Sequence, residues 1–419
     1  MNEAEARNDD AGPSSVTFAS GLSWTRVRLP RLLSRIGKAF YLAGALGALG
    51  MLFEIPTAFG FGSLISILAW PLFIVSYILS LTQTSFGGGL TASSTELVVL
   101  SGTRRTAIPI AEIAGVLVVE RKVAGGIIPT LEIELTSGDR LTARSPDPDA
   151  PQAVARALGF GPGGKRNHAS LAKPTHRLLH PLLGLIAYAG GIGAGLGIGE
   201  WVRQFPGLDF VVASYPLFTL LLYTLLRYLV RPPWVTVGDD GVVLKSLFRS
   251  HFVAARDIFF VSGGPDSPDG TPAIEERSGK RVAVGSLLLD KARLAAVSCL
   301  VAELASSSAT TADRFSHYDR AGRALAAWRD HLARAMNDTS YRHNASTVDE
   351  AASVLRSPRA TPEQRVGAAL ALRVAGQPRE RIRVAVEGAA DDRVREALEA
   401  VADADDDVVI EKALKRLQP

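Results

Sequence analysis

Cysteine is almost absent from this chain, and complete catalytic motifs are missing altogether. Cys299 is the single cysteine among 419 residues, which excludes a disulfide within the chain and disfavours a thiolate metal site. Its apolar neighbours Ala296, Val297 and Leu300 predict a buried thiol. Neither a Gly-x-Ser-x-Gly nor a His-Glu-x-x-His motif occurs. We therefore predict no catalytic residue, no metal ligand and no cofactor.

One segment comes close to a phosphate-binding P-loop. Residues 159–166 read Gly-Phe-Gly-Pro-Gly-Gly-Lys-Arg, with Arg166 where the motif needs Ser or Thr to hold magnesium. Pro162 also removes one of the amides that would contact phosphate. We interpret the segment as a flexible linker whose basic pair faces a membrane.

Charged side chains are missing from several long stretches. No Asp, Glu, Lys or Arg lies between Lys38 and Glu54, or between Glu54 and Glu96. Since roughly 20 apolar residues cross a bilayer, these stretches and their second-half counterparts predict four membrane-spanning helices. The expected spans are residues 34–54, 61–81, 178–199 and 210–230.

Positive charge is concentrated beside the apolar stretches. The net charge is +4, and Lys and Arg precede the first and third expected spans and end the fourth. Under the positive-inside rule, this pattern predicts an inner (cytoplasmic) membrane protein with both termini in the cytoplasm. It also favours a lipid bilayer over nucleic acid as the partner of the basic residues.

Small residues recur every four positions in the expected first and third spans. Such rows let membrane helices approach closely. We expect them to pack within a four-helix bundle, and the alternative is the seam of a homo-oligomer. The residues are Ala43, Gly47, Ala189, Gly193 and Gly197.

The chain repeats itself at a nearly fixed spacing. Arg31-Leu32-Leu33 recurs as Arg177-Leu178-Leu179, 146 positions later. Leu97-Val98-Val99 then matches Val242-Val243-Leu244 at a spacing of 145, and a further block matches at 141. Such self-similarity indicates internal duplication. The drop in spacing puts one strand of the second copy, or its pairing, in doubt.

Each copy continues into short alternating runs separated by turn residues, which predict a small antiparallel barrel or sandwich. Three blocks match between the copies: Leu90-Thr91, Glu96-Leu97-Val98-Val99 and Ile108-Pro109-Ile110-Ala111-Glu112-Ile113 in the first, and Val235-Thr236, Gly241-Val242-Val243-Leu244 and Val253-Ala254-Ala255-Arg256-Asp257-Ile258 in the second. These segments resemble the bacterial PH-like (pleckstrin-homology-like) domains of multi-pass membrane proteins. The resemblance implies a small barrel after each membrane hairpin, a role in binding or oligomerisation, and no catalytic residues.

Basic residues occupy matching turns of the two β segments. Arg104 and Arg105 in the first copy correspond to Arg249 in the second. A basic turn held against a membrane would contact anionic lipid headgroups, so these three residues are the candidate lipid contacts. The alternative is an ordinary solvated turn.

The last part of the chain changes to Ala, Arg, Glu and Asp with helical periodicity. Arg365-Val366-x-x-Ala369-Leu370 recurs 28 positions later as Arg393-Val394-x-x-Ala397-Leu398. This region resembles short HEAT-type α-repeats. Such stacks expose a face for partners, so we expect residues 307–419 to bind an unknown cytoplasmic protein.

The sequence therefore predicts a membrane α+β protein with two tandem units of transmembrane hairpin plus PH-like barrel, followed by an all-α HEAT-like domain. The expected function is a non-enzymatic multi-pass membrane protein presenting platforms for protein or lipid binding. The alternative is a transporter or channel component built on the tandem hairpins. The expected parts are a disordered cytoplasmic tail (1–30), hairpin 1 (31–84), β domain 1 (85–160), a linker (161–176), hairpin 2 (177–231), β domain 2 (232–306) and the helical domain (307–419).

Overall fold

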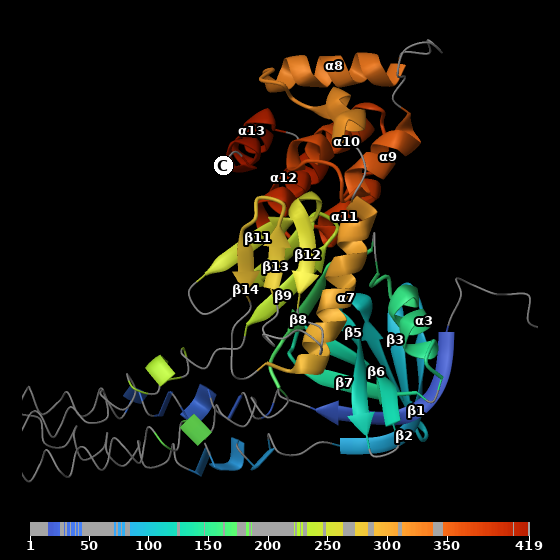
Figure 1. Cartoon of the computed structure of the whole chain (residues 1–419), viewed down its shortest axis with the longest axis vertical. Helices are drawn as coiled ribbons and strands as arrows, with labels where there is room; N and C mark the ends of the chain where they lie inside the picture. Colours follow the sequence, from blue (N-terminus) through green and yellow to red (C-terminus); the bar gives the residue numbers. More distant parts are fainter. Residues whose placement is uncertain are drawn as a thin grey trace, which may run out of the picture.

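The computed structural model describes most of the chain outside the apolar stretches. The described residues are 16–25, 84–123, 126–145, 147–161, 164–173, 233–245, 249–262, 273–283, 289–308, 312–337, 347–404 and 406–417, with isolated positions in 29–43, 71–79, 182–186 and 222–228. They form antiparallel sheets followed by helices near the C-terminus (Figure 1).

The predicted membrane architecture is wrong on the structural evidence. The expected spans 34–54, 61–81, 178–199 and 210–230 fall mostly outside the described residues. Within the described part, every helix is too short or too polar to cross a bilayer. This finding overturns the membrane fold class, the multi-pass inner-membrane localisation, the membrane-platform function and the transporter alternative.

The first β unit is a seven-stranded antiparallel sheet closed by one helix. Its strand order is β4-β3-β2-β1-β7-β6-β5, so the long first strand joins two sets of hairpins. Leu90, Leu131 and Leu141 are fully buried inside the curved sheet, where helix α3 adds Val154. The elements are β1 (Val16–Thr25), β2 (Thr84–Ala92), β3 (Glu96–Ser101), β4 (Arg104–Pro109), β5 (Ile113–Val123), β6 (Gly126–Leu135), β7 (Arg140–Arg144) and α3 (Ala150–Ala157).

The second β unit repeats this element order with shorter strands. Its described strands form two separate sheets, of order β11-β10-β9-β8 and β12-β13-β14. Seven strands are present among the described residues, so no strand is lost, although β8 has four residues where β1 has ten. The pairing differs between the units, because β1 pairs with β7 whereas β8 and β14 belong to separate sheets. The elements are β8 (Asn167–Ser170), β9 (Trp234–Gly238), β10 (Gly241–Lys245), β11 (Ser250–Ala254), β12 (Ile258–Ser262), β13 (Ala273–Glu276), β14 (Arg281–Ala283) and α7 (Lys291–Ser308).

Each β unit begins with a strand that precedes its apolar stretch. Strand β1 occupies part of the segment predicted to be a disordered tail (1–30), and β8 occupies part of the predicted linker (161–176). The two strands end at Thr25 and Ser170, which are 145 positions apart. Each pairs with the strand after the apolar stretch, β2 or β9. The repeated unit therefore starts one strand earlier than the sequence indicated.

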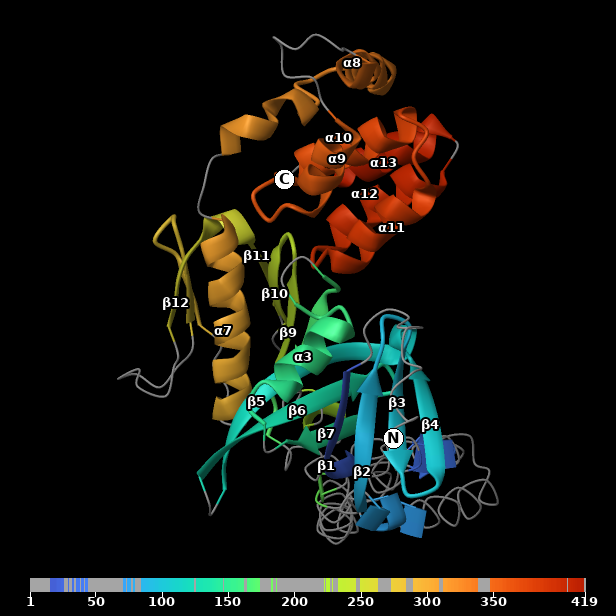
Figure 2. The same ribbon diagram turned by 90° about the vertical axis from the view of Figure 1, so that its right-hand side faces the viewer.

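The helical domain lies next to β9 and β10 of the second β unit, at the end of the molecule away from β1 and β2 (Figures 1 and 2). Helix α10 is buried along nearly its whole length and contacts the helices around it. Thr361 caps its first turn, with the reciprocal bond from the Thr361 amide to Gln364. The elements are the 3-10 helix η4 (Ala312–Tyr318), α8 (Leu325–Asn337), α9 (Val348–Arg356), α10 (Pro362–Val374), α11 (Arg379–Gly388), α12 (Asp392–Asp403) and α13 (Asp407–Leu417).

Candidate functional site

The three arginines predicted to contact lipid occupy equivalent positions in the two β units. Arg104 and Arg105 begin β4, one of the two edge strands of its sheet, and Arg249 directly precedes β11. All three are exposed. Arg105 lies 3.6 Å from Glu96, and both side chains are exposed, so this ion pair adds little stability. Arg104 and Arg105 thus lie on the strand that follows the turn, and contact with a lipid headgroup stays a prediction.

The residues expected to pack membrane helices give no site. Ala43 is exposed, and the other four (Gly47, Ala189, Gly193 and Gly197) lie outside the described residues. Cys299 is exposed on α7, so its predicted burial is wrong. Within the described residues, no group of three or more His, Cys, Asp or Glu side chains has an arrangement that could hold a metal ion.

The two β units are joined through β5, which serves both of their cores. Val116 packs into the core of the first unit, whereas Leu117 and Val119 pack into the core of the second. Alternate side chains of a strand point to opposite faces, so one strand can be buried on both. Helix α7 of the second unit lies against β5 (Figure 2).

A buried ionic network crosses the same boundary. Glu132 on β6 accepts hydrogen bonds from Arg293 of α7 and from Arg121 of β5, whose Nε lies 3.0 Å from Oε1. Arg121 also bonds Asp290 at 2.9 Å, and Arg293 donates to the Ser170 carbonyl at 2.9 Å. Only 1% of Arg293 is exposed. Such a charge is tolerated in an interior only when it is paired.

The electrostatics of Glu132 follow from these contacts. Burial, the largest single influence, raises the pKa of the Glu132 carboxyl, but the nearby Arg293, Arg140 and Arg121 together outweigh it. The pKa of Glu132 therefore lies below its ordinary value. The carboxylate stays ionised as the centre of the network.

An asparagine side chain closes the edge of β5. Asn167 of β8 accepts a hydrogen bond from the Val116 amide at 2.9 Å and donates one to the Val116 carbonyl at 2.5 Å. This contact requires a glycine beside it, since a Cβ on Gly115 would lie 2.3 Å from the His168 carbonyl oxygen. The amide thus takes the place of a neighbouring strand at that point.

A second junction holds the helical domain against the turn between β9 and β10. The Asp240 carboxylate accepts hydrogen bonds from the Ala390 and Asp391 amides at 2.6 and 2.9 Å, directly before α12. A carboxylate is favoured there by the helix dipole and the free amides. The backbones also meet closely, since a Cβ on Gly238 would lie 2.4 Å from the Gly388 carbonyl oxygen.

The near P-loop segment belongs to this second junction. Lys165 lies 2.9 Å from Glu387, and the Arg166 amide donates to the Glu387 carbonyl at 3.0 Å. Burial, and next the positive charge of Arg395, lower the pKa of the Arg166 guanidinium. The interpretation of a membrane-facing basic pair is therefore wrong, because both residues contact the helical domain.

A groove lies between α8 and α13. It has a volume of about 530 Å³ and is lined by Leu325, Asp407, Val408, Glu411, Lys412 and Lys415. Val408 is 71% exposed, and Val409 beside it is also exposed. The two exposed valines form an apolar patch on α13 beside this groove.

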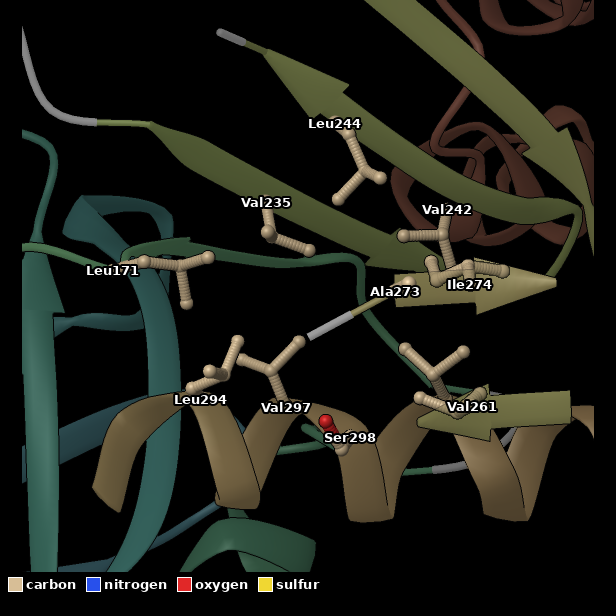
Figure 3. A pocket seen from close by; sticks show the side chains of 11 residues that line it. Leu171, Val235, Val242, Leu244, Val261, Ala273, Ile274, Leu294, Val297 and Ser298 are labelled. Carbon is tan, nitrogen blue, oxygen red and sulfur yellow. The ribbon is translucent and has the colours of Figure 1, made fainter. Parts of the chain in front are cut away.

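The described residues of the second β unit enclose a much smaller cavity in their interior. Its cavity, shown in Figure 3, is lined by apolar side chains of β9, β10 and α7, with Ser298 at its margin. The cavity measures about 20 Å³, which is room for about one water molecule. A gap of this size is a packing defect in a small core and cannot take an organic ligand.

Comparison with known proteins gives no relative from which the role of these surfaces could be inferred. No family model matches the chain, and no curated protein matches it. The groove and the two junctions are therefore interpreted from their own chemistry.

Proposed function

We propose that this chain is a protein-binding scaffold, in which the groove between α8 and α13 receives the partner. The observation that carries the proposal is the outer face of α13, where Val408 and Val409 are exposed beside a groove of about 530 Å³. Exposed apolar side chains beside a hollow mark interaction sites. The proposal is for a binding protein without catalytic residues.

The two junctions support this role because they hold the groove in a defined position. Glu132 and Arg293 fasten one β unit to the other, and Asp240 fastens the helical domain to the second. A partner bound at α13 would then be held at a set distance from both β units. A rigid support of this kind lowers the entropic cost of binding.

We also propose that the β units are PH-like and that the helical domain is HEAT-like. Support for the first is the shared order of seven antiparallel strands and a closing helix. Support for the second is the 28-residue repeat, whose apolar residues are buried on both α10 and α12. Both assignments concern architecture and name no ligand.

The test is site-specific photo-crosslinking of the full chain in its native cells. A crosslinking side chain at position 408 should capture one discrete polypeptide, whereas the same group at the exposed Glu303 of α7 should not. The purified partner should bind the wild-type chain and fail to bind Val408→Asp. The absence of any adduct at position 408, or the same adducts at both positions, contradicts the proposal.

A further inference from the structure

The acidic side chains of the groove have ion-pair partners, whereas its lysines have none among the described residues. Asp407 forms an ion pair with Arg329 of α8, and Glu411 is paired with Arg320 at 2.9 Å. Lys412 and Lys415 line the same groove, and neither has an ion-pair partner among the described residues. The two carboxylates are thus neutralised from within the chain, and the two lysines leave the groove positively charged.

Along α13, the groove passes from an apolar end to a basic end. Leu325 and Val408 lie at its apolar end, near the first residues of α8 and α13. Lys412 and Lys415 follow Val408 by four and seven positions, which is the spacing of one helix face. At 1.5 Å per residue, Lys412 and Lys415 lie about 6 and about 10.5 Å farther along α13 than Val408.

On the basis of the proposed function, we infer that the occupant of this groove is an amphipathic helix of a partner protein that carries an apolar residue and two carboxylates on one face. The carboxylates lie four and seven positions from the apolar residue, because the helix runs along α13 and matches its spacing. The apolar side chain contacts Val408 and Leu325, and the carboxylates face Lys412 and Lys415. This is recognition of a helix in a groove, with charge selecting among apolar helices.

The test measures binding of synthetic helical peptides to the full chain by fluorescence anisotropy. One peptide carries Leu at position i with Glu at i+4 and i+7, the second has Gln at both Glu positions, and the third has Lys. We expect the Glu peptide to bind about tenfold more tightly than the Gln peptide at low salt, with the difference shrinking as salt is added.

A charge exchange provides the matched variant. Lys412→Glu with Lys415→Glu should weaken binding of the Glu peptide about tenfold and create binding of the Lys peptide. A variant with Lys122→Glu and Lys291→Glu, both exposed and far from α13 in the sequence, should bind like the wild type. Because Lys412 and Lys415 are exposed, the exchanged protein should remain folded.

Three outcomes overturn the inference. Equal binding of the Glu and Gln peptides would show that charge does not select the occupant. An unchanged affinity for the Glu peptide after the charge exchange would show that the peptide binds outside this groove. Self-association that is lost on the charge exchange, measured by analytical ultracentrifugation, would make a second copy of the chain the occupant. The scaffold function survives these results if crosslinking at position 408 still captures a partner, so the two failures are distinguishable.

Discussion

Glu132 and Arg293 are the residues on which the contact between the two β units depends most directly. Both are almost completely buried, and they are bonded to each other across the boundary. A buried ion pair contributes little compared with an apolar pair of similar size, but removing one member leaves an uncompensated charge. The stability of this boundary is therefore sensitive to single substitutions.

We expect Glu132→Gln to lower the free energy of unfolding by about 3–5 kcal/mol at neutral pH, because it leaves Arg293 buried without its counter-charge. Urea unfolding measures this loss. Glu120→Gln, at an exposed position on β5, should change stability by less than about 0.5 kcal/mol. Replacing both Glu132 and Arg293 by Met should recover much of the loss. A loss below about 1 kcal/mol for Glu132→Gln would contradict this view of the network.

The acid side of the stability profile should depend on the same carboxyl. Since the pKa of Glu132 is lower in the folded chain than its ordinary value of 4.5, its contribution is present above that pH. It is lost as the pH falls through the folded value. The stability difference between the wild type and Glu132→Gln should therefore shrink below about pH 4.5.

His168 provides a second pH-dependent contribution, at higher pH. Its ring stacks on Trp234 at 4.7 Å, and Nδ1 lies 2.7 Å from the Thr236 hydroxyl. Burial lowers its pKa below the ordinary 6.5, so the folded state disfavours the protonated ring. Stability should be full above pH 6.5 and decline as the pH falls below it. His168→Gln should flatten this decline in thermal unfolding, and a pKa of 6.5 or higher from an NMR titration of His168 would contradict it.

At the scale of elements, the turn between β9 and β10 is the main attachment point of the helical domain. The Asp240 carboxylate bonds two amides at the start of α12, and Asp239 donates its amide to the Gly388 carbonyl at 2.9 Å. The fully buried Arg365 of α10 lies 3.9 Å from Asp239. One short acidic turn thus contacts both α10 and the residues before α12.

We expect Asp240→Ala to destabilise the attachment by about 1–2 kcal/mol, because it removes a charged acceptor at a helix N-terminus. Calorimetry should then separate the unfolding of the helical domain from that of the β units, with the helical domain melting at lower temperature. Glu303→Gln on the exposed face of α7 is the matched control and should leave the transition unchanged. An unaltered calorimetric profile for Asp240→Ala would show that the turn does not hold the domain.

The elements with clear periodicity were predictable from the sequence. The helical periodicity of the sequence predicts helices at 348–355, 362–375 and 392–401, and the structure confirms α9, α10 and α12 to within about two residues. The same periodicity predicts one helix over 313–336, which is wrong because the helix is interrupted at Ala321 and Gly322, which adopt positive φ angles of 49° and 76°. A glycine tolerates that conformation, and the helix cannot continue through it.

The first strands of the two β units were not predictable by pattern. Strand β1 contains Gly and Ser within its apolar alternation, and β8 is the four-residue run Asn-His-Ala-Ser. Both are separated by a long apolar stretch from the strands they pair with. Their pairing depends on contacts between distant residues, which a local pattern does not contain.

At the scale of the whole molecule, the two copies of the repeated unit are not equivalent, because the second copy packs against the first. The second unit packs against Gly115 of the first, where a side chain would collide with the His168 carbonyl. The close approach of the two backbones at this point therefore depends on the absence of a side chain at Gly115.

The sequence by itself determined the duplication, the turns and strands that follow each apolar stretch, and the helical character of the C-terminal part. These features depend on the local spacing and periodicity of the residues. Only the tertiary structure decided how the parts meet. Glu132 with Arg293, Asn167 with Val116, and Asp240 with the start of α12 join residues that are far apart in the chain. Whether a charged side chain or a backbone group is buried at such a contact depends on which surfaces of the folded chain face each other. The groove on α13 has the same origin, since its charge is set by which residues Arg320 and Arg329 reach across space.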